Sequence, residues 1–283
     1  MEGVVESILR SMSSINRPQM LFMLSLFGVL SIFCGKATFR NLSRYSNYCE
    51  KSYSRWYRRK FNFVEFNAKL IRHELAEAEL LGVIDASFMK KSGKCTEGLG
   101  WFYNSCNDKA ERGLETSVVA VVDVRSNTAY GIDSEQTIDK VPLQGKDKEH
   151  TRVDLYVDQI KRVSAELKAL NVRYLAADSY YAKAKFVNTT LKLGFDIIGK
   201  LRIDANLKWL YEGDYSGVGR PRSFDGKVRI TEGLSRFDFE GRLEDGVEVY
   251  SKVVWSVNLK RKIKVVILRW GQGDLAINIQ MSS

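Results

Sequence analysis

Two short apolar segments, each ending in an aspartate, decide the fold that this sequence predicts. Residues 80–85 read LLGVID, and residues 173–178 read RYLAAD. A short apolar run bounded by polar residues is typical of a buried strand. Asp85 and Asp178 are therefore expected at strand ends, where a sheet holds them rigidly while their carboxylates stay in water.

The segments around these two strands predict a mixed α/β sheet. Residues 116–124 (TSVVAVVDV) form a β-branched strand, and residues 127–133 are its expected hairpin partner. Residues 153–170 and 182–193 have apolar residues at helical spacing, and residues 196–199 read as another strand. A strand, a hairpin and then alternating helix and strand is the order of such a sheet.

The two ends of the chain differ in their predicted secondary structure. Residues 1–75 read as helical: Asn16 and Pro18 suit the start of an apolar helix, Gly35 suits its end, and a second helix is expected from about Leu42. Beyond residue 200 the sequence favours strands and glycine-rich turns, with strands expected near residues 228–230, 247–257 and 262–270. The predicted domains are 1–75, 76–204 and 205–283.

The apolar run at residues 20–34 (MLFMLSLFGVLSIFC) is the segment that resembles a membrane span. It is shorter than the roughly 20 residues that a crossing requires, so a buried core helix is expected and no membrane partner. A membrane-associated basic protein would need this helix to be exposed. The four cysteines form no CxxC pair, which fits a reducing, cytoplasmic location.

A formal net charge of +10 favours a polyanionic partner. Between residues 36 and 73 ten basic residues face two acidic ones, and nine aromatic residues are interleaved with them. Basic and aromatic side chains on short helices suit contact with DNA phosphates, while a solvated basic face over an aromatic core is the alternative. The candidate DNA-binding residues of this segment are Arg40, Arg44, Arg55, Arg58 and Arg59.

Two further basic patches lie near the C-terminus. Arg220 and Arg222 flank Pro221 in a glycine-rich segment, which reads equally well as a DNA-following arm or as an exposed loop. Residues 251–270 contain six basic residues and no acidic one, including Lys260, Arg261 and Lys262. Side chains on strands alternate between faces, so about half of these cations could point at one DNA surface.

Asp85 and Asp178 are the candidate catalytic and metal-binding residues. A pair of aspartates on adjacent strands is a natural oxygen-ligand site for Mg²⁺, for which Mn²⁺ can substitute. Two such ions activate a water or hydroxyl and stabilise the leaving oxygen in phosphoryl transfer. The structural alternative is that each aspartate forms a turn or caps the next helix, as Asp178 could before Ser179.

Several ordered motifs resemble one family. The region of the first aspartate comprises residues 82–88 (GVIDASF), 90–94 (KKSGK), 98–102 (GLGWF) and 115–117 (ETS). The region of the second comprises residues 176–181 (AADSYY), 185–186 (KF) and 194–195 (GF). Further matches are residues 16–19 (NRPQ), 41–45 (NLSRY), 217–222 (GVGRPR) and 225–228 (DGKV). Together they resemble, along essentially the whole chain, bacterial insertion-sequence DDE transposases with a β-strand insertion domain.

The resemblance implies a ribonuclease-H-like, integrase-type core with an N-terminal helical DNA-binding domain and a β-rich insertion. It implies that Asp85, Asp178 and a later glutamate hold two Mg²⁺ ions, and that the enzyme cuts double-stranded DNA at transposon ends and joins them to target DNA. It also implies a homodimer for the full-length enzyme.

The sequence departs from that family at the third carboxylate. The family places its glutamate on a helix with Tyr, Arg, Glu and Lys at fixed spacing, and no tyrosine after Asp178 begins that pattern. Glutamates such as Glu212, Glu240 and Glu248 lie in strand or turn texture and are expected to be solvated surface residues. We therefore expect a C-terminally truncated copy that is inactive alone. The alternative function is a non-catalytic DNA-binding fragment that inhibits transposition.

Overall fold

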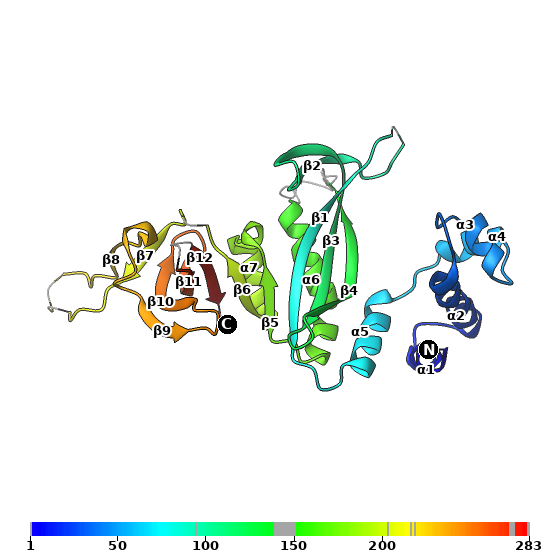
Figure 1. Ribbon diagram of the computed structural model, residues 1–283, viewed down its shortest axis with the longest axis horizontal. Helices are drawn as coiled ribbons and strands as arrows, with labels where there is room; N and C mark the ends of the chain where they lie inside the picture. Colours follow the sequence, from blue (N-terminus) through cyan, green and yellow to red (C-terminus); the bar gives the residue numbers. More distant parts are fainter. Residues whose placement is uncertain are drawn as a thin grey trace. The chain divides into compact units, whose positions relative to one another are not determined.

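The computed structural model describes residues 2–93, 95–138, 151–202, 204–215, 217, 219–271 and 275–281. The chain divides into two compact units, Met1–Ala78 and Glu79–Ser283. The first unit is helical, and the second contains a large mixed sheet with two main helices (Figure 1). The expected combination of a helical N-terminal part with a mixed α/β part is therefore present.

The first unit consists of short helices, namely α1 (Glu2–Ser11), α2 (Arg17–Ile32), α3 (Phe39–Leu42), α4 (Glu50–Tyr57) and α5 (Phe63–Glu74), with a 3-10 turn η1 (Ser43–Tyr45). The Asn16 side chain accepts a hydrogen bond from the Gln19 N–H at 3.0 Å, which confirms the predicted start of α2. The expected single helix from Leu42 is wrong. The Ser46 hydroxyl instead accepts from the Tyr48 N–H at 3.2 Å, a local bond that competes with helix formation.

Phe22 is at the centre of this unit's core. Its ring stacks on Trp56 at 5.3 Å between centroids and meets Tyr53 edge-on at 5.4 Å. Helix α2 is buried on this side, whereas Leu30 and Ile32 are exposed, so the predicted core helix is covered only in part. None of the helices within the described ranges is long and apolar enough to cross a membrane.

The α/β part of the second unit contains six strands, β1 (Leu80–Lys90), β2 (Gly100–Asn104), β3 (Lys109–Asp123), β4 (Thr128–Thr137), β5 (Tyr174–Ala177) and β6 (Asp196–Lys200). Strands β4, β3 and β1 are antiparallel neighbours, and β1, β5 and β6 are parallel neighbours, giving the order β4-β3-β1-β5-β6. Helices α6 (Arg152–Ala169) and α7 (Ala184–Lys192) precede β5 and β6 respectively. The sequence predicted each of these elements except β2. The expectation that Asp85 ends its strand is wrong, because residues 85–90 continue the antiparallel ladder with β3 and β1 ends only at Lys90.

Helix α6 covers one face of β3 and β4 (Figure 1). Its Gln159 accepts a hydrogen bond from the Ser117 hydroxyl at 2.6 Å, and its Tyr156 hydroxyl donates to Glu115 at 2.6 Å. These buried polar contacts come from alternate residues of β3, which therefore share the face beneath α6. The residues between them point to the opposite face.

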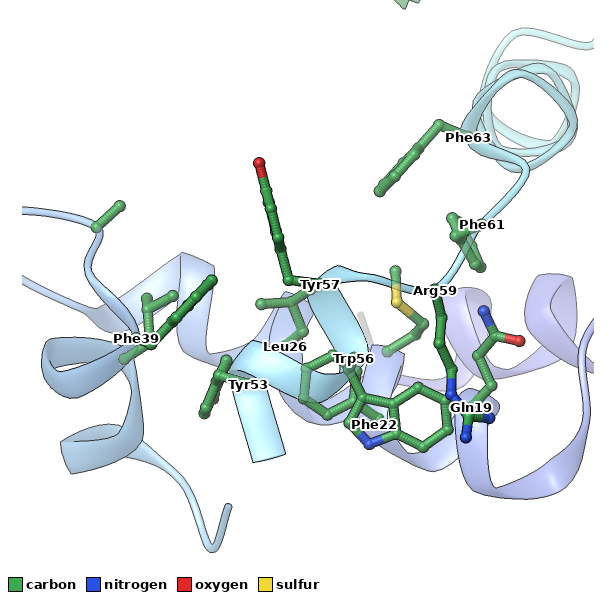
Figure 2. Close-up of a pocket in the computed structure, with 13 residues that line it drawn as sticks. Gln19, Phe22, Leu26, Phe39, Tyr53, Trp56, Tyr57, Arg59, Phe61 and Phe63 are labelled. Atoms are coloured by element: carbon green, nitrogen blue, oxygen red, sulfur yellow. The ribbon is translucent and has the colours of Figure 1, made fainter. Parts of the chain in front are cut away.

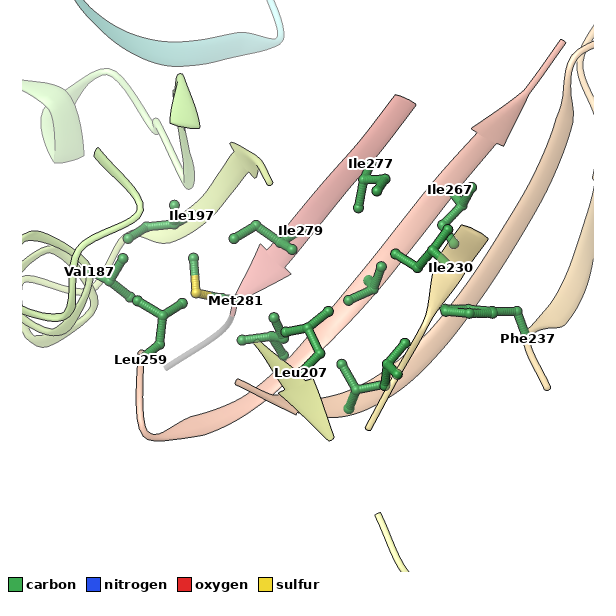
Figure 3. Close-up of a cluster of buried hydrophobic side chains, with 14 of the residues drawn as sticks. Val187, Ile197, Leu207, Ile230, Phe237, Leu259, Ile267, Ile277, Ile279 and Met281 are labelled. Atoms are coloured by element: carbon green, nitrogen blue, oxygen red, sulfur yellow. The ribbon is translucent and has the colours of Figure 1, made fainter. Parts of the chain in front are cut away.

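The β-rich part adds β7 (Leu207–Leu210), β8 (Phe224–Lys227), β9 (Asp238–Arg242), β10 (Glu248–Ser256), β11 (Arg261–Arg269) and β12 (Leu275–Met281). Strand β12 pairs antiparallel with β6, so one sheet runs past the predicted boundary at residues 204–205. Figure 3 shows Ile197 of β6, Val187 of α7 and Ile279 of β12 meeting in one apolar cluster. The division into domains 76–204 and 205–283 remains a prediction.

Some strands of this part differ from expectation. The strand predicted near residues 228–230 is wrong: Val228 follows β8, and Ile230–Glu232 is a 3-10 turn. Both Val228 and Ile230 are buried in the cluster of Figure 3, so their apolar character reflects core packing and not strand pairing. Strands β7, β9 and β12 were not predicted; β7 pairs with β10 and β12 pairs with β6, which are distant in sequence, whereas β9 forms a hairpin with β10.

Gly113 provides a test of the sheet. A Cβ there would lie 2.5 Å from the Met89 carbonyl oxygen and against the Phe88 ring. We expect Gly113→Ala to destabilise the protein by about 1–3 kcal/mol, because backbone cannot move aside cheaply. Gly131→Ala is the matched control: its Cβ meets nothing within 4 Å, so stability should be unchanged or higher. Urea denaturation monitored by circular dichroism measures both, and equal stabilities would contradict the register at Gly113.

Candidate functional site

Asp85 and Asp178 are brought to the same level of the sheet by the pairing of β1 with β5. The parallel register aligns Val83 with Ala176 and Ile84 with Ala177. Asp178 keeps an extended backbone, with φ −73° and ψ 179°, so the next aligned residues are the two aspartates. Neighbouring strands lie about 4.8 Å apart, so the register predicts that the two aspartates are neighbours.

Asp85 lies on the face of the sheet opposite α6, because it pairs with Val118, whereas the neighbouring Ser117 bonds Gln159 of α6. Ile84 is buried at 2% exposure, whereas Asp85 is exposed, as alternation along a strand requires. Ala177 is only partly exposed, and Asp178 after it is exposed. The face that carries Asp85 is thus reached by solvent, while the α6 face forms the core.

The two aspartates differ in their hydrogen bonds. The Asp178 carboxylate accepts from the Tyr180 N–H at 2.9 Å and caps the 3-10 turn η2 (Ser179–Tyr181), as the capping interpretation expected. For Asp85 no side-chain hydrogen bond or ion pair is seen within the described ranges. The Tyr180 N–H occupies only one lone pair of the Asp178 carboxylate, so the two aspartates keep carboxylate oxygens that could bind Mg²⁺. This ion accepts one or two carboxylates together with water and phosphate.

Tyr181 is a site residue that the sequence analysis missed. It is 4% exposed, and its hydroxyl has no hydrogen-bond partner of acceptable geometry in the described part of the chain. Burial raises the pKa of Tyr181 above its usual range, and the negative charges of Asp85 and Asp178 raise it further, outweighing a lowering effect of Ser117. Both carboxylates therefore lie within electrostatic reach of one phenol. The available signal was the Tyr-Tyr pair directly after Asp178.

A third carboxylate does not join the pair among the described residues, which contain no cluster of three His, Cys, Asp or Glu side chains that could hold a metal ion. Glu212, Glu232 and Glu240 are exposed and lie within ion-pair distance of basic residues. Glu248 differs from the expected solvated residue. Hydrogen bonds from Arg242, Arg269 and Tyr250 hold its pKa at about 2, and its side chain is only 15% exposed.

The predicted basic residues of the first unit are all on its surface. Arg40, Arg44, Arg55, Arg58 and Arg59 are exposed, and the Arg59 guanidinium lies over the Trp56 ring at 4.6 Å from its centroid. The alternative of a basic face above an aromatic core also fits this arrangement.

Some of the predicted basic residues of the second unit already form hydrogen bonds within the chain. Arg222 donates to Asp225 at 2.8 Å and to the Phe224 carbonyl at 3.0 Å, whereas Arg220 is exposed. The Arg261 guanidinium lies 3.4 Å from the Asn188 side-chain oxygen, and Lys260 and Lys262 are exposed beside it.

Strand β11 alternates as predicted, with Ile263 and Val265 buried and Lys262 and Lys264 exposed. Strand β11 pairs with β10, which also pairs with β9, and these two strands bring acids that the local sequence lacks. Lys264 lies 3.5 Å from Glu240, and Arg269 bonds Glu248. This basic segment is therefore less positive in the fold than in the sequence.

Comparison with known proteins adds little to this geometry. No protein-family model matches the chain, and no curated protein matches it significantly. Two similar solved structures are of Ciona intestinalis endonuclease V in complex with inosine-containing 24mer and 23mer DNA, the second with an Asp-to-Asn variant of that enzyme. They are 12% and 14% identical, with TM-scores of 0.34 and 0.33, and each match covers 74% of this chain and 72% of the other. At such TM-scores we infer neither fold nor function from them.

Metal binding tests the aspartate pair. We expect Asp85→Asn and Asp178→Asn each to weaken Mn²⁺ binding by at least about tenfold, since even the loss of an outer-shell partner can cost that much. Glu244→Gln, which neutralises an exposed carboxylate in the β-rich part, should leave binding unchanged. Electron paramagnetic resonance of free Mn²⁺ during titration measures all three, and wild-type affinity in both aspartate variants would refute a shared site.

Proposed function

We propose that this chain is a transposase polypeptide of the insertion-sequence DDE type, which binds DNA and holds Mg²⁺ between Asp85 and Asp178. The observation that supports the proposal is the parallel register of β1 and β5, which aligns Ile84 with Ala177, so that an exposed aspartate follows at the same level on each strand. The order β4-β3-β1-β5-β6, with helices crossing to the two parallel strands, fits the ribonuclease-H-like core that the motifs imply.

The residues have separate roles in this proposal. The sheet fixes Asp85 and Asp178 as metal ligands, and a bound Mg²⁺ would neutralise the charge that develops on a reacting phosphate. The exposed arginines of the first unit, Arg40, Arg44, Arg55, Arg58 and Arg59, contact the phosphate backbone and so hold the DNA. Arg220, Lys260 and Lys262 offer further exposed cations in the second unit.

A second function, a DNA-binding protein that inhibits transposition without cutting, has one observation in its favour. The described residues contain no cluster of three His, Cys, Asp or Glu side chains that could hold a metal ion, whereas the implied two-metal mechanism uses three carboxylates. Such a protein would occupy transposon ends and keep an active enzyme from them. DNA binding is common to both functions, and cleavage distinguishes them.

DNA affinity should depend steeply on salt. For the full chain and a duplex, we expect the logarithm of the affinity to fall linearly with the logarithm of salt concentration, because neutralised phosphates release counterions. Replacing Arg55, Arg58 and Arg59 by glutamine should reduce the slope by about 0.9 for each phosphate that is no longer neutralised. Lys192→Gln, at an exposed cation that ends α7, is the control. Fluorescence anisotropy measures the slopes, and salt-independent binding would argue against phosphate binding.

Cleavage distinguishes the two functions. With Mg²⁺ or Mn²⁺ and DNA carrying transposon ends, we expect the 283-residue chain to bind but not to nick, because two carboxylates provide too few ligands for two ions. A gel assay on labelled ends reports nicking. Metal-dependent nicking that Asp85→Ala or Asp178→Ala abolishes would contradict this expectation and establish the enzyme directly. If Glu212→Ala abolished it too, Glu212 would be the third ligand.

A further inference from the structure

The first unit contains an aromatic pocket that the proposed function does not use. Its volume is about 320 Å³, and side chains of α2, α3, α4 and the start of α5 line it, at the lower end of the size range for small-ligand pockets. Figure 2 shows the Tyr57 and Phe63 rings on two sides of an open space, with Phe22 and Trp56 below. Tyr57 is 78% exposed and Phe63 50% exposed, so both rings stand at the mouth in contact with water.

The charge of the pocket selects the kind of ligand. Arg59 is the one charged residue among those that line it, and its guanidinium already covers the Trp56 ring. Aromatic pockets attract cations through the faces of their rings, but here a cation would meet Arg59 and find no lining carboxylate. A planar, uncharged aromatic group fits better. Gln19, whose amide donates to the Lys60 carbonyl at 2.9 Å, provides a polar group at the wall.

The surface around the pocket favours a polyanion. Between residues 36 and 60 the chain has one acidic residue, Glu50, and eight exposed basic ones, Lys36, Arg40, Arg44, Lys51, Arg55, Arg58, Arg59 and Lys60. A ligand that combines a planar uncharged ring with a string of negative charges is a nucleobase that remains attached to its DNA strand. Stacking on aromatic side chains is how proteins bind unpaired bases irrespective of sequence.

We propose that this pocket accepts one nucleobase displaced from the stack of bound DNA, which enters between Tyr57 and Phe63 while exposed arginines hold the flanking phosphates. This inference rests on the proposed DNA-binding function and adds a preference for DNA with an unpaired base. Displacement of a base costs least where the base is already unpaired. The preference should therefore be strongest for DNA that contains an extrahelical base.

The test uses the full chain and three duplexes of one sequence: fully paired, with one extrahelical base, and with an abasic site in place of that base. We expect the wild type to bind the extrahelical base about 5- to 150-fold more tightly than the abasic site, the fold-change that corresponds to one stacked base. Tyr57→Ala and Phe63→Ala should each reduce this preference, whereas Tyr57→Phe, which keeps the ring, should retain it. Phe239→Ala, at a 56% exposed ring of the second unit, is the control.

A readout on the wild type makes the test independent of how the variants fold. With 2-aminopurine as the extrahelical base, stacking in the pocket should quench its fluorescence on binding. Equal affinity for all three duplexes, with no quenching, would overturn the pocket inference and leave the proposed function in place. Loss of a dimer in Tyr57→Ala by sedimentation, with base preference unchanged, would assign the pocket to a second copy and overturn the inference. Absence of binding to every duplex would overturn both proposals.

Discussion

The parallel pairing of β1 with β5 is the constraint on which the rest of the second unit depends. Parallel neighbours need a crossover connection, and α6 supplies it between β4 and β5. The helix buries its apolar side on the sheet, with Gln159 bonded to Ser117 as a buried anchor. Alternate residues of β1 are then left for the opposite face. Asp85 is one of them, and the same register brings Asp178 to the same level, so one packing arrangement fixes both the core and the level of the two aspartates.

The same sheet redistributes charge. Residues 251–270 look uniformly basic along the chain, yet antiparallel pairing places Glu240 near Lys264 and Glu248 against Arg269. Arg242 completes a cluster in which two arginines lower the pKa of Glu248. In the first unit the helices are short, and the arginines from residue 40 to residue 59 stay on the surface. Positive charge is therefore retained mainly where helices expose it, and is partly neutralised where strands pair.

Much of the fold could be predicted because the signals are local. The apolar runs before Asp85 and Asp178, the β-branched run in β3 and the helical spacing in α6 depend only on residues near one another, and each became the expected element. Strand β12 was not predicted; it forms a hairpin with β11, but its pairing with β6 joins residues far apart in sequence, which no local pattern contains. Val228 and Ile230 led to the prediction of a strand that the structure does not contain. They are apolar because they fill the core, although only Val228 adjoins a strand.

The sequence by itself determined that each of the two aspartates follows an apolar strand segment and that the first unit is basic and aromatic, because residue type and spacing carry that information. Only the tertiary structure decided that Asp85 and Asp178 lie at the same level, that the buried Tyr181 hydroxyl lies near both, and that aromatic side chains of separate helices enclose a pocket beside Arg59. These facts depend on register and on the packing of elements remote in sequence. No local pattern contains them, since side chains meet across a sheet or between helices only after the chain has folded.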